Sequence, residues 1–144
     1  MTTQPAQPAA AQFGYTLALA ERTLTHVLRD HLAERGTEPE TWYALQLIAM
    51  RGPGIARESL STELEGSRSL DAQSTRELLS RLEADGLIHG DSHLDLTAQG
   101  AALHAGLRDY IAIPRNRLLS QFDEEDIETT VRTLQAIAER ALAG

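Results

Sequence analysis

Apolar residues recur at three- and four-residue steps over two stretches in the first third of the chain, a spacing typical of amphipathic helices. The first stretch carries Phe13, Leu17, Ala20, Leu24, Val27, Leu28 and Leu32. It predicts a long helix over 13–36 that ends at Gly36. Thr37 and Glu40 have capping-box spacing, so a second helix is expected to begin there and to stop at Gly52. Residues 1–12 are rich in Pro, Ala and Gln without this period and predict a disordered tail.

The middle of the chain predicts two short helices followed by a hairpin. Ile55, Leu60 and Leu64 fit a helical segment that breaks near Gly66, and Asp71 is a candidate N-cap for the next helix. That second helix has its apolar positions at Thr75, Leu78, Leu79 and Leu82, and Asp85-Gly86 closes it. Residues 87–88 and 94–96 then predict two short strands around a polar turn. A helix-turn-helix followed by a small hairpin indicates a winged helix over about 37–97.

Two further helices are expected to complete the chain. The first begins at Thr97, and Pro114 should kink or break it because proline has no amide proton. The second follows Asp123 and has an acidic first turn, which suits the positive end of a helix dipole. With 144 residues and 42% apolar content, residues 13–144 predict one mainly α-helical domain with a single core.

Composition excludes several kinds of chemistry. The chain has no cysteine, so disulfides, thiolate catalysis and cysteine-based zinc sites are ruled out. We find no nucleophile and base in a recognisable arrangement and no phosphate-binding glycine loop, so neither an enzyme nor a cofactor is expected. No apolar run is long enough for a membrane span, and the first residues lack the pattern of a secretion signal. These features favour a cytoplasmic protein.

Two sequence stretches resemble the MarR family of bacterial transcriptional regulators. The run from Ser74 to Ile88 is similar to that family's recognition helix and first wing strand, and Leu96-Thr97-Ala98-Gln99-Gly100 is similar to its entry into the next helix. The resemblance implies a homodimer in which helices 13–36 and 98–143 form the dimer interface. It also implies a DNA-binding regulator, a repressor, that binds a pseudo-palindromic operator of double-stranded DNA and responds to a small effector.

If the helix that follows Asp71 enters the major groove, its first outward residues reach base edges. Gln73 has the amide geometry to pair with adenine, and Arg76 has the guanidinium geometry to pair with guanine. The residues expected to hold phosphates are Ser67, Arg68, Ser69 and Ser74. The alternative is that Arg76 and Arg81 pair with Glu77 and Glu83 on a solvated helix face.

The charge of the chain argues against DNA binding. The net charge is −8, and residues 57–100 carry four arginines against nine carboxylates. The seven residues from His89 to Asp95 contain no arginine, whereas MarR wings normally carry one, and Glu77 lies on the same outward stripe as Arg76. Because phosphate neutralisation dominates affinity for nucleic acid, a second hypothesis stands beside the first. In it, a MarR-like dimer has lost DNA binding and serves as a ligand-binding or protein-interaction module.

Two further groups of residues have a functional and a structural interpretation. Tyr15 and Trp42 are candidates to line a pocket for a small aromatic effector, although the spacing of Trp42 favours core packing. His89, Asp91, His93 and Asp95 alternate as metal ligands would on a strand. A tight turn would spread them apart, so we assign no metal site and keep a metal-dependent module as a third hypothesis.

Overall fold

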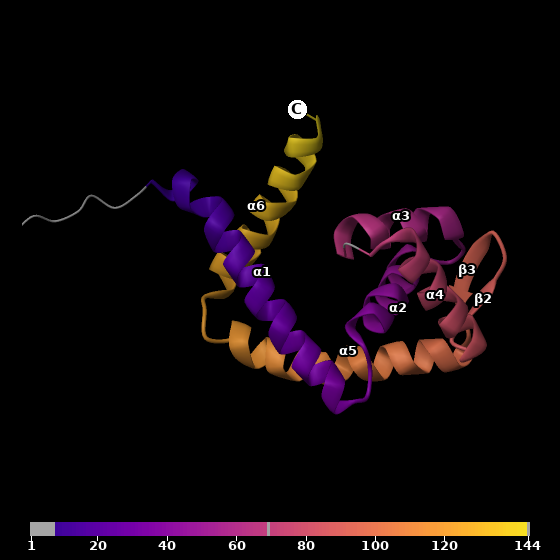
Figure 1. Cartoon of the computed structure of the whole chain (residues 1–144). Coiled ribbons are helices and arrows are strands. Elements are labelled where there is room, and N and C mark those ends of the chain that lie inside the picture. The colour runs from indigo at the N-terminus through magenta and orange to yellow at the C-terminus, as the bar shows by residue number, and fades with distance from the viewer. Residues whose placement is uncertain (1–7, 69, 144) are drawn as a thin grey trace, which may run out of the picture. The chain divides into compact units, whose positions relative to one another are not determined.

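The protein is described by a computed structural model that covers residues 8–68 and 70–143. Within these residues the chain is mainly helical, with six helices and a small three-stranded antiparallel sheet (Figure 1). The helices are α1 (Ala9–Glu34), α2 (Pro39–Arg51), α3 (Arg57–Arg68), α4 (Ala72–Ala84), α5 (Ala98–Leu119) and α6 (Glu124–Ala143). The strands are β1 (Ile55–Ala56), β2 (Ile88–Gly90) and β3 (His93–Leu96). The predicted mainly α fold with a winged helix-turn-helix is confirmed.

Helix α1 begins earlier than its apolar pattern indicates. It starts at Ala9, so it takes in residues 9–12 of the stretch expected to be a tail, while residues 1–7 of that stretch lie outside the described part of the chain. Three consecutive alanines explain the extension, since alanine has the highest helix propensity. The helix ends as predicted at Gly36, which has a φ of 66° and donates its amide proton to the Ala33 carbonyl.

Helix α2 starts without the capping box predicted from Thr37 and Glu40. The Thr37 hydroxyl donates instead to the backbone carbonyl of Arg35, and Glu38 precedes the helix without a side-chain cap. The Thr37 amide is already used in the turn that ends α1, where it donates to the Leu32 carbonyl. Thr37 therefore stabilises the end of α1 and does not cap α2.

Helix α4, the second helix of the helix-turn-helix, is capped at both ends. Asp71 caps the helix, as predicted, and its Oδ1 accepts a hydrogen bond of 2.6 Å from the Ser74 amide. At the other end Gly86 has a φ of 75° and donates to the Glu83 carbonyl, while Leu87 donates to the Leu82 carbonyl. This pair of bonds is a Schellman motif, and it turns the chain directly into the first strand of the wing.

The sheet has the strand order β1-β3-β2, with β2 and β3 forming the predicted hairpin. The placement of Ile55 on the helical segment of Leu60 and Leu64 is wrong, since Ile55 lies in β1 and α3 begins at Arg57. Strand β1 was not predicted, because two residues are too short to show an alternating pattern. Ile55 pairs with Leu94 and Ile88 pairs with Leu96, which places apolar side chains of all three strands together. Gly90 has a φ of 121°, and a Cβ there would overlap the His93 carbonyl, so the hairpin turn requires glycine.

The motif Leu-Thr-x-x-Gly has a clear structural role at the start of α5. The Thr97 hydroxyl donates to the Gly86 carbonyl at 2.6 Å and accepts from the Gly100 amide at 3.0 Å, so one side chain both caps α5 and ties it to the end of α4. A Cβ at Gly100 would overlap the Leu87 carbonyl oxygen. Glycine is therefore needed for the close approach of α5 to Leu87, the residue that precedes the first strand of the wing.

Helix α5 continues through Pro114 to Leu119, so the predicted break at the proline does not occur. A proline inside a helix removes one hydrogen bond, but its fixed φ is compatible with helical backbone on both sides. No helix among the described residues is both long and apolar enough to cross a membrane.

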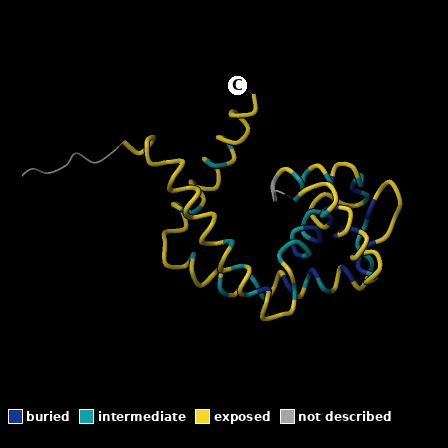
Figure 2. Tube along the Cα trace, viewed as in Figure 1, coloured by how far each residue is buried: buried dark blue, intermediate teal, exposed yellow. Residues whose placement is uncertain are grey.

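The chain divides after Leu107 into two compact units, Met1–Leu107 and Arg108–Gly144. The first unit contains the core, which draws on α2, α3, α4 and all three strands (Figure 2). The core residues are Ala44, Leu45, Ile48, Ile55, Leu60, Leu64, Leu78, Leu79, Leu82, Leu87, Ile88 and Leu94. In the second unit, none of the residues 108–143 is buried. The packing that positions α4 therefore lies entirely within the first unit.

Candidate nucleic-acid interface

Helix α4 has one buried face and one exposed face. Thr75, Leu78, Leu79 and Leu82 are buried against the core. Gln73, Arg76, Glu77 and Ser80 are exposed, as the predicted outward stripe requires. Ser74 lies between the two faces and is partly exposed. The structure thus presents Gln73, Ser74 and Arg76 on the same part of α4.

The start of α4 is organised around the Asp71 carboxylate. Hydrogen bonds from the backbone and side chain of Ser74 lower the pKa of Asp71 below its ordinary value, and the positive charge of Arg76 adds to this effect. The Thr75 hydroxyl donates to the Asp71 carbonyl at 3.0 Å. Asp71 consequently competes with any phosphate for the Ser74 hydroxyl.

The arginines of the winged helix are paired differently from the arrangement predicted for a solvated face. Arg81 pairs with Glu38 at 3.1 Å, across to the start of α2, and Glu83 accepts from Arg57. Glu77 accepts a hydrogen bond of 3.1 Å from the Gln73 amide. The alternative pairing of Arg76 and Arg81 with Glu77 and Glu83 is therefore not found among the described residues. Within residues 8–68 and 70–143, Arg76 takes part in no ion pair or hydrogen bond.

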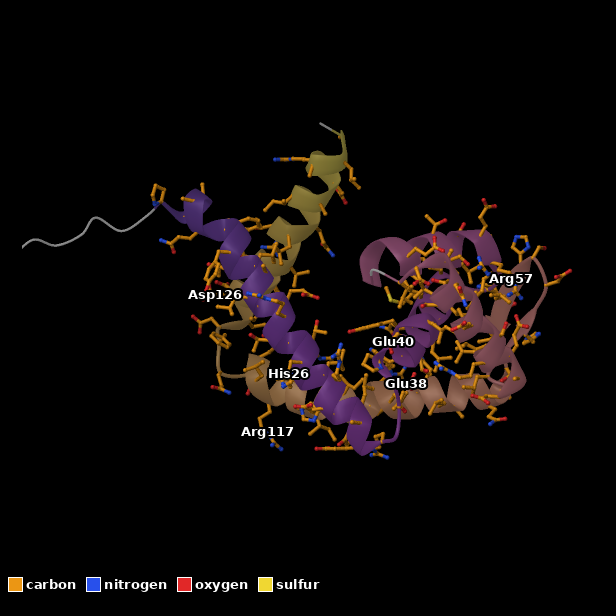
Figure 3. The ribbon with its side chains drawn as sticks, viewed as in Figure 1. His26, Glu38, Glu40, Arg57, Arg117 and Asp126 are labelled. Carbon is orange, nitrogen blue, oxygen red and sulfur yellow. The ribbon has the colours of Figure 1, made fainter. Side chains whose placement is uncertain are left out.

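Arg57 fastens the wing to α4, a role that the sequence did not reveal (Figure 3). Its Nε donates to the Asp91 carbonyl at 2.8 Å, and its backbone amide donates to the Ser92 carbonyl at 2.8 Å. One of its terminal nitrogens donates to the Glu83 carboxylate on α4. Arg57 and Glu83 are 26 residues apart, so no local spacing rule could have paired them. The short wing is held by Arg57 instead of carrying an arginine of its own.

The wing does not bring its alternating histidines and aspartates together. Asp95 Oδ1 accepts a hydrogen bond of 2.6 Å from the Gly54 amide, and it thereby anchors the turn before β1. His93 Nδ1 lies 3.2 Å from the Ser92 hydroxyl. Among the residues that the structure describes, no group of three or more His, Cys, Asp or Glu side chains is placed to hold a metal ion. A turn separates β2, which ends at Gly90, from β3, which begins at His93, and it interrupts the alternation of an ideal strand as expected.

Three of the predicted phosphate contacts cannot be placed. Ser69 lies outside the described residues, and so do the side chains of Ser67 and Arg68, whose backbone ends α3.

The two residues considered for an effector pocket have different environments. Tyr15 is 70% exposed on α1, whereas Trp42 is 8% exposed on α2. Trp42 stacks on His104 of α5, with ring centroids 5.4 Å apart and an interplanar angle of 11°. His104 Nε2 lies 2.6 Å from Gln46 Oε1. This packed arrangement, which joins α2 to the first part of α5, favours the packing role of Trp42 over a ligand contact.

Comparison by sequence finds no relative: no family model matches the chain, and no curated protein matches it. Comparison by structure finds many matching chains. A MarR family protein of Mycobacterium tuberculosis in complex with DNA superposes with a TM-score of 0.70 at 22% identity, over 92% of this chain and 98% of the other.

Two further matches have the same extent. A MarR family transcriptional regulator from Rhodococcus sp. RHA1 matches with a TM-score of 0.74 at 18% identity, over 92% of this chain and 96% of the other. MarR of Staphylococcus aureus, in complex with salicylate and kanamycin, matches with a TM-score of 0.76 at 17% identity, over 93% of each chain. Across nearly its whole length, the chain therefore has the winged-helix fold of MarR-family transcriptional regulators.

Proposed function

We propose that this protein is a homodimeric DNA-binding transcriptional regulator, a repressor, that binds a pseudo-palindromic operator with α4 in the major groove. The proposal rests on one observation. Arg76 is exposed on α4, the proposed recognition helix, and it forms no ion pair with any described residue. Gln73 and Arg76 provide base contacts, and Ser67, Arg68, Ser69 and Ser74 hold phosphates. One structural match, a MarR family protein of Mycobacterium tuberculosis, is a complex with DNA.

The distribution of charge supports local binding despite the acidic total. Of the arginines in the winged helix, Arg57 and Arg81 are paired with glutamates that would otherwise add negative charge near α4. Arg76 lies one helical turn from the start of α4, and its positive charge is not used in an ion pair with any described residue. The arrangement of charge at this helix start matters more for binding than the net charge of the chain.

The exposed apolar faces support the homodimer. Six large apolar side chains are exposed in the second unit: Ile113, Leu118, Phe122, Val131, Ile137 and Leu142. Helix α1 adds Phe13, Leu17, Leu19, Leu24 and Val27. Apolar surface of this extent on a soluble protein marks an interaction site, and closed two-fold dimers are the commonest homo-oligomers. A dimer places two copies of α4 on one DNA duplex.

Regulation by a small aromatic molecule is the remaining part of the proposal. One structural match is a complex with salicylate, and another, from Rhodococcus jostii RHA1, is a complex with p-coumaroyl-CoA. An effector that changes the spacing of the two α4 helices would alter affinity for the operator. Tyr15 is accessible to such a ligand, whereas Trp42 could contact it only if the stack with His104 opened.

The test is a binding titration with fluorescently labelled DNA from the region upstream of the gene, at salt concentrations from about 50 to 200 mM. The wild-type protein should bind tightly at low salt, and its affinity should fall steeply as salt rises. Arg76→Ala should weaken specific binding by about 1–3 kcal/mol. Arg140→Ala removes the same charge from the exposed end of α6 and should leave binding unchanged.

The second candidate function is a dimer that has lost DNA binding and acts as a ligand-binding or protein-interaction module. It is favoured by the excess of carboxylates in residues 57–100 and by a wing that carries no arginine. This function predicts that the wild-type protein binds neither upstream DNA nor random-sequence DNA at any salt concentration. That result would overturn the repressor proposal and leave the dimer unaffected.

A further inference from the structure

Glu77 occupies the middle of the exposed face of α4, between residues proposed to meet DNA. It is exposed, and its Oε1 accepts a hydrogen bond of 3.1 Å from Gln73 Nε2. The two residues are one helical turn apart, at the i,i+4 spacing that brings such side chains together. The amide thus restricts the position of the carboxylate, and the second carboxylate oxygen has no hydrogen-bond partner among residues 8–68 and 70–143.

The Glu77 carboxylate restricts the groups on DNA that this part of α4 can approach. It is repelled by phosphates, and it accepts hydrogen bonds without donating any. In the major groove, guanine presents only acceptors and thymine presents an acceptor and a methyl group. Adenine and cytosine both present an amino donor, but the adenine N6 group lies beside the N7 acceptor, which repels a carboxylate. Cytosine N4 is the favoured partner of a carboxylate, so cytosine satisfies the position of Glu77 best.

The neighbouring side chain has the opposite preference. Arg76 supplies only donors, which match the N7 and O6 acceptors of guanine. Gln73 keeps a second amide hydrogen and its own carbonyl oxygen while it holds Glu77, so it can still contact adenine. The exposed face of α4 consequently presents a donor group and an acceptor group side by side.

We propose that Glu77 is a specificity-determining residue that selects a cytosine in each operator half-site by accepting a hydrogen bond from cytosine N4, with Gln73 as its positioning residue. The inference rests on the proposed function, since it requires α4 to enter the major groove. Glu77 is the acidic residue that argues most directly against DNA binding. In this inference it helps to select the DNA sequence that the protein binds.

The experiment is selection from a random-sequence DNA library with the full-length wild-type protein, Glu77→Ala and Glu128→Ala. The wild type should enrich a site with a cytosine at one position of each half-site. Glu77→Ala should lower the preference for that cytosine by about tenfold, the discrimination supplied by one good base contact. Glu128→Ala removes the same charge from the exposed surface of α6 and should select the wild-type site. Circular dichroism of each variant verifies that the helices are intact.

The possible results separate this inference from the proposed function. If the wild type enriches no sequence and binds no DNA at low salt, the repressor proposal fails. If it enriches a site that Glu77→Ala also selects unchanged, the repressor proposal stands and the role of Glu77 is overturned. The same conclusion follows if Glu77→Ala only strengthens binding to all sequences equally, because Glu77 would then act as a repulsive charge. Loss of preference at a base other than cytosine also contradicts the inference.

Discussion

The two compact units of this chain differ in where their apolar side chains lie. In the winged helix, leucines such as Leu60 and Leu64 have no exposed surface, and twelve residues form one buried cluster. In residues 108–143 no side chain is buried, and Leu142 is 91% exposed. Both parts nevertheless carry helices with regular apolar stripes. An amphipathic pattern therefore predicts that a helix has an apolar face, and it does not tell whether the same chain covers that face.

The two units therefore differ in how their folds are stabilised. The winged helix can be stabilised by its own core, because burying a leucine side chain contributes about 1.5–3 kcal/mol. The second unit gains no comparable burial within one chain, so its helices need a partner surface to offset the entropy lost on ordering. The first unit should then keep its fold when the second loses its partner, and this expectation can be tested.

The largest expected effect is loss of the dimer when a charge is placed on the apolar stripe of α6. Val131 is 47% exposed and lies on that stripe with Leu134 and Ile127. In Val131→Asp a carboxylate would be buried without a partner in the dimer interface, and the protein should become monomeric. Analytical ultracentrifugation measures the mass, and the fluorescence of Trp42, the single tryptophan, should stay unchanged because it reports on the winged helix.

The matched control is Thr133→Asp, which adds the same charge at an exposed position away from the stripe and should remain dimeric. A dimeric Val131→Asp protein would show that α6 is not the interface. A monomeric wild type would remove the dimer from the proposed function.

The second largest expected effect is the loss of stability that a cavity in the core of the winged helix causes. Leu64→Ala removes a fully buried side chain from the core and should lower the free energy of unfolding by about 2–5 kcal/mol. Met50→Ala shortens an apolar side chain that is 66% exposed on α2 and lies outside the proposed dimer interface, so it should change the free energy of unfolding by less than about 0.5 kcal/mol. Urea denaturation followed by Trp42 fluorescence measures both. Equal costs for the two variants would show that the packing of Leu64 does not stabilise the winged helix.

Sequence patterns predicted the local features of the fold and missed contacts between distant segments. The cap at Asp71, the turn at Gly86 and the hairpin follow from residue types within a few positions of one another, and all three are present. The capping box at Thr37 failed because the end of the preceding helix already uses that residue.

The same limit applies to the candidate site. The i,i+4 spacing of Gln73 and Glu77 could have revealed their hydrogen bond. The attachment of Arg57 to the wing and to Glu83, and that of Asp95 to Gly54, depend on how the whole winged helix packs. For the same reason, the exposed stripe on α4 was predicted correctly, whereas the alternative pairing of Arg76 and Arg81 with Glu77 and Glu83 is not found among the described residues.

A smaller effect is expected when the attachment of the wing is removed. Arg57→Ala loses the bonds to the Asp91 carbonyl and the Glu83 carboxylate, and it should lower the free energy of unfolding by about 1 kcal/mol because the ion pair is partly exposed. Amide hydrogen exchange should speed up in β2 and β3 and stay unchanged in α2. Arg51→Ala, which breaks the exposed pair with Glu63, is the control and should leave exchange in the wing as it is in the wild type. A wing equally protected in Arg57→Ala would show that the sheet alone holds it.

The smallest effect concerns the cap of α4 and its dependence on pH. Because hydrogen bonds from Ser74 lower the pKa of Asp71 in the folded protein, ionised Asp71 stabilises the fold at pH values above the ordinary value of 3.8. This contribution is lost as the pH falls through the lowered pKa. Asp71→Ala should therefore melt at a lower temperature than the wild type at pH 7, and the difference should shrink in acid. Asp71→Asn keeps a capping oxygen without a titrating group and should melt close to the wild type at pH 7. A difference between Asp71→Ala and the wild type that is the same at pH 7 and below pH 3 would mean that the charge of the cap does not stabilise α4.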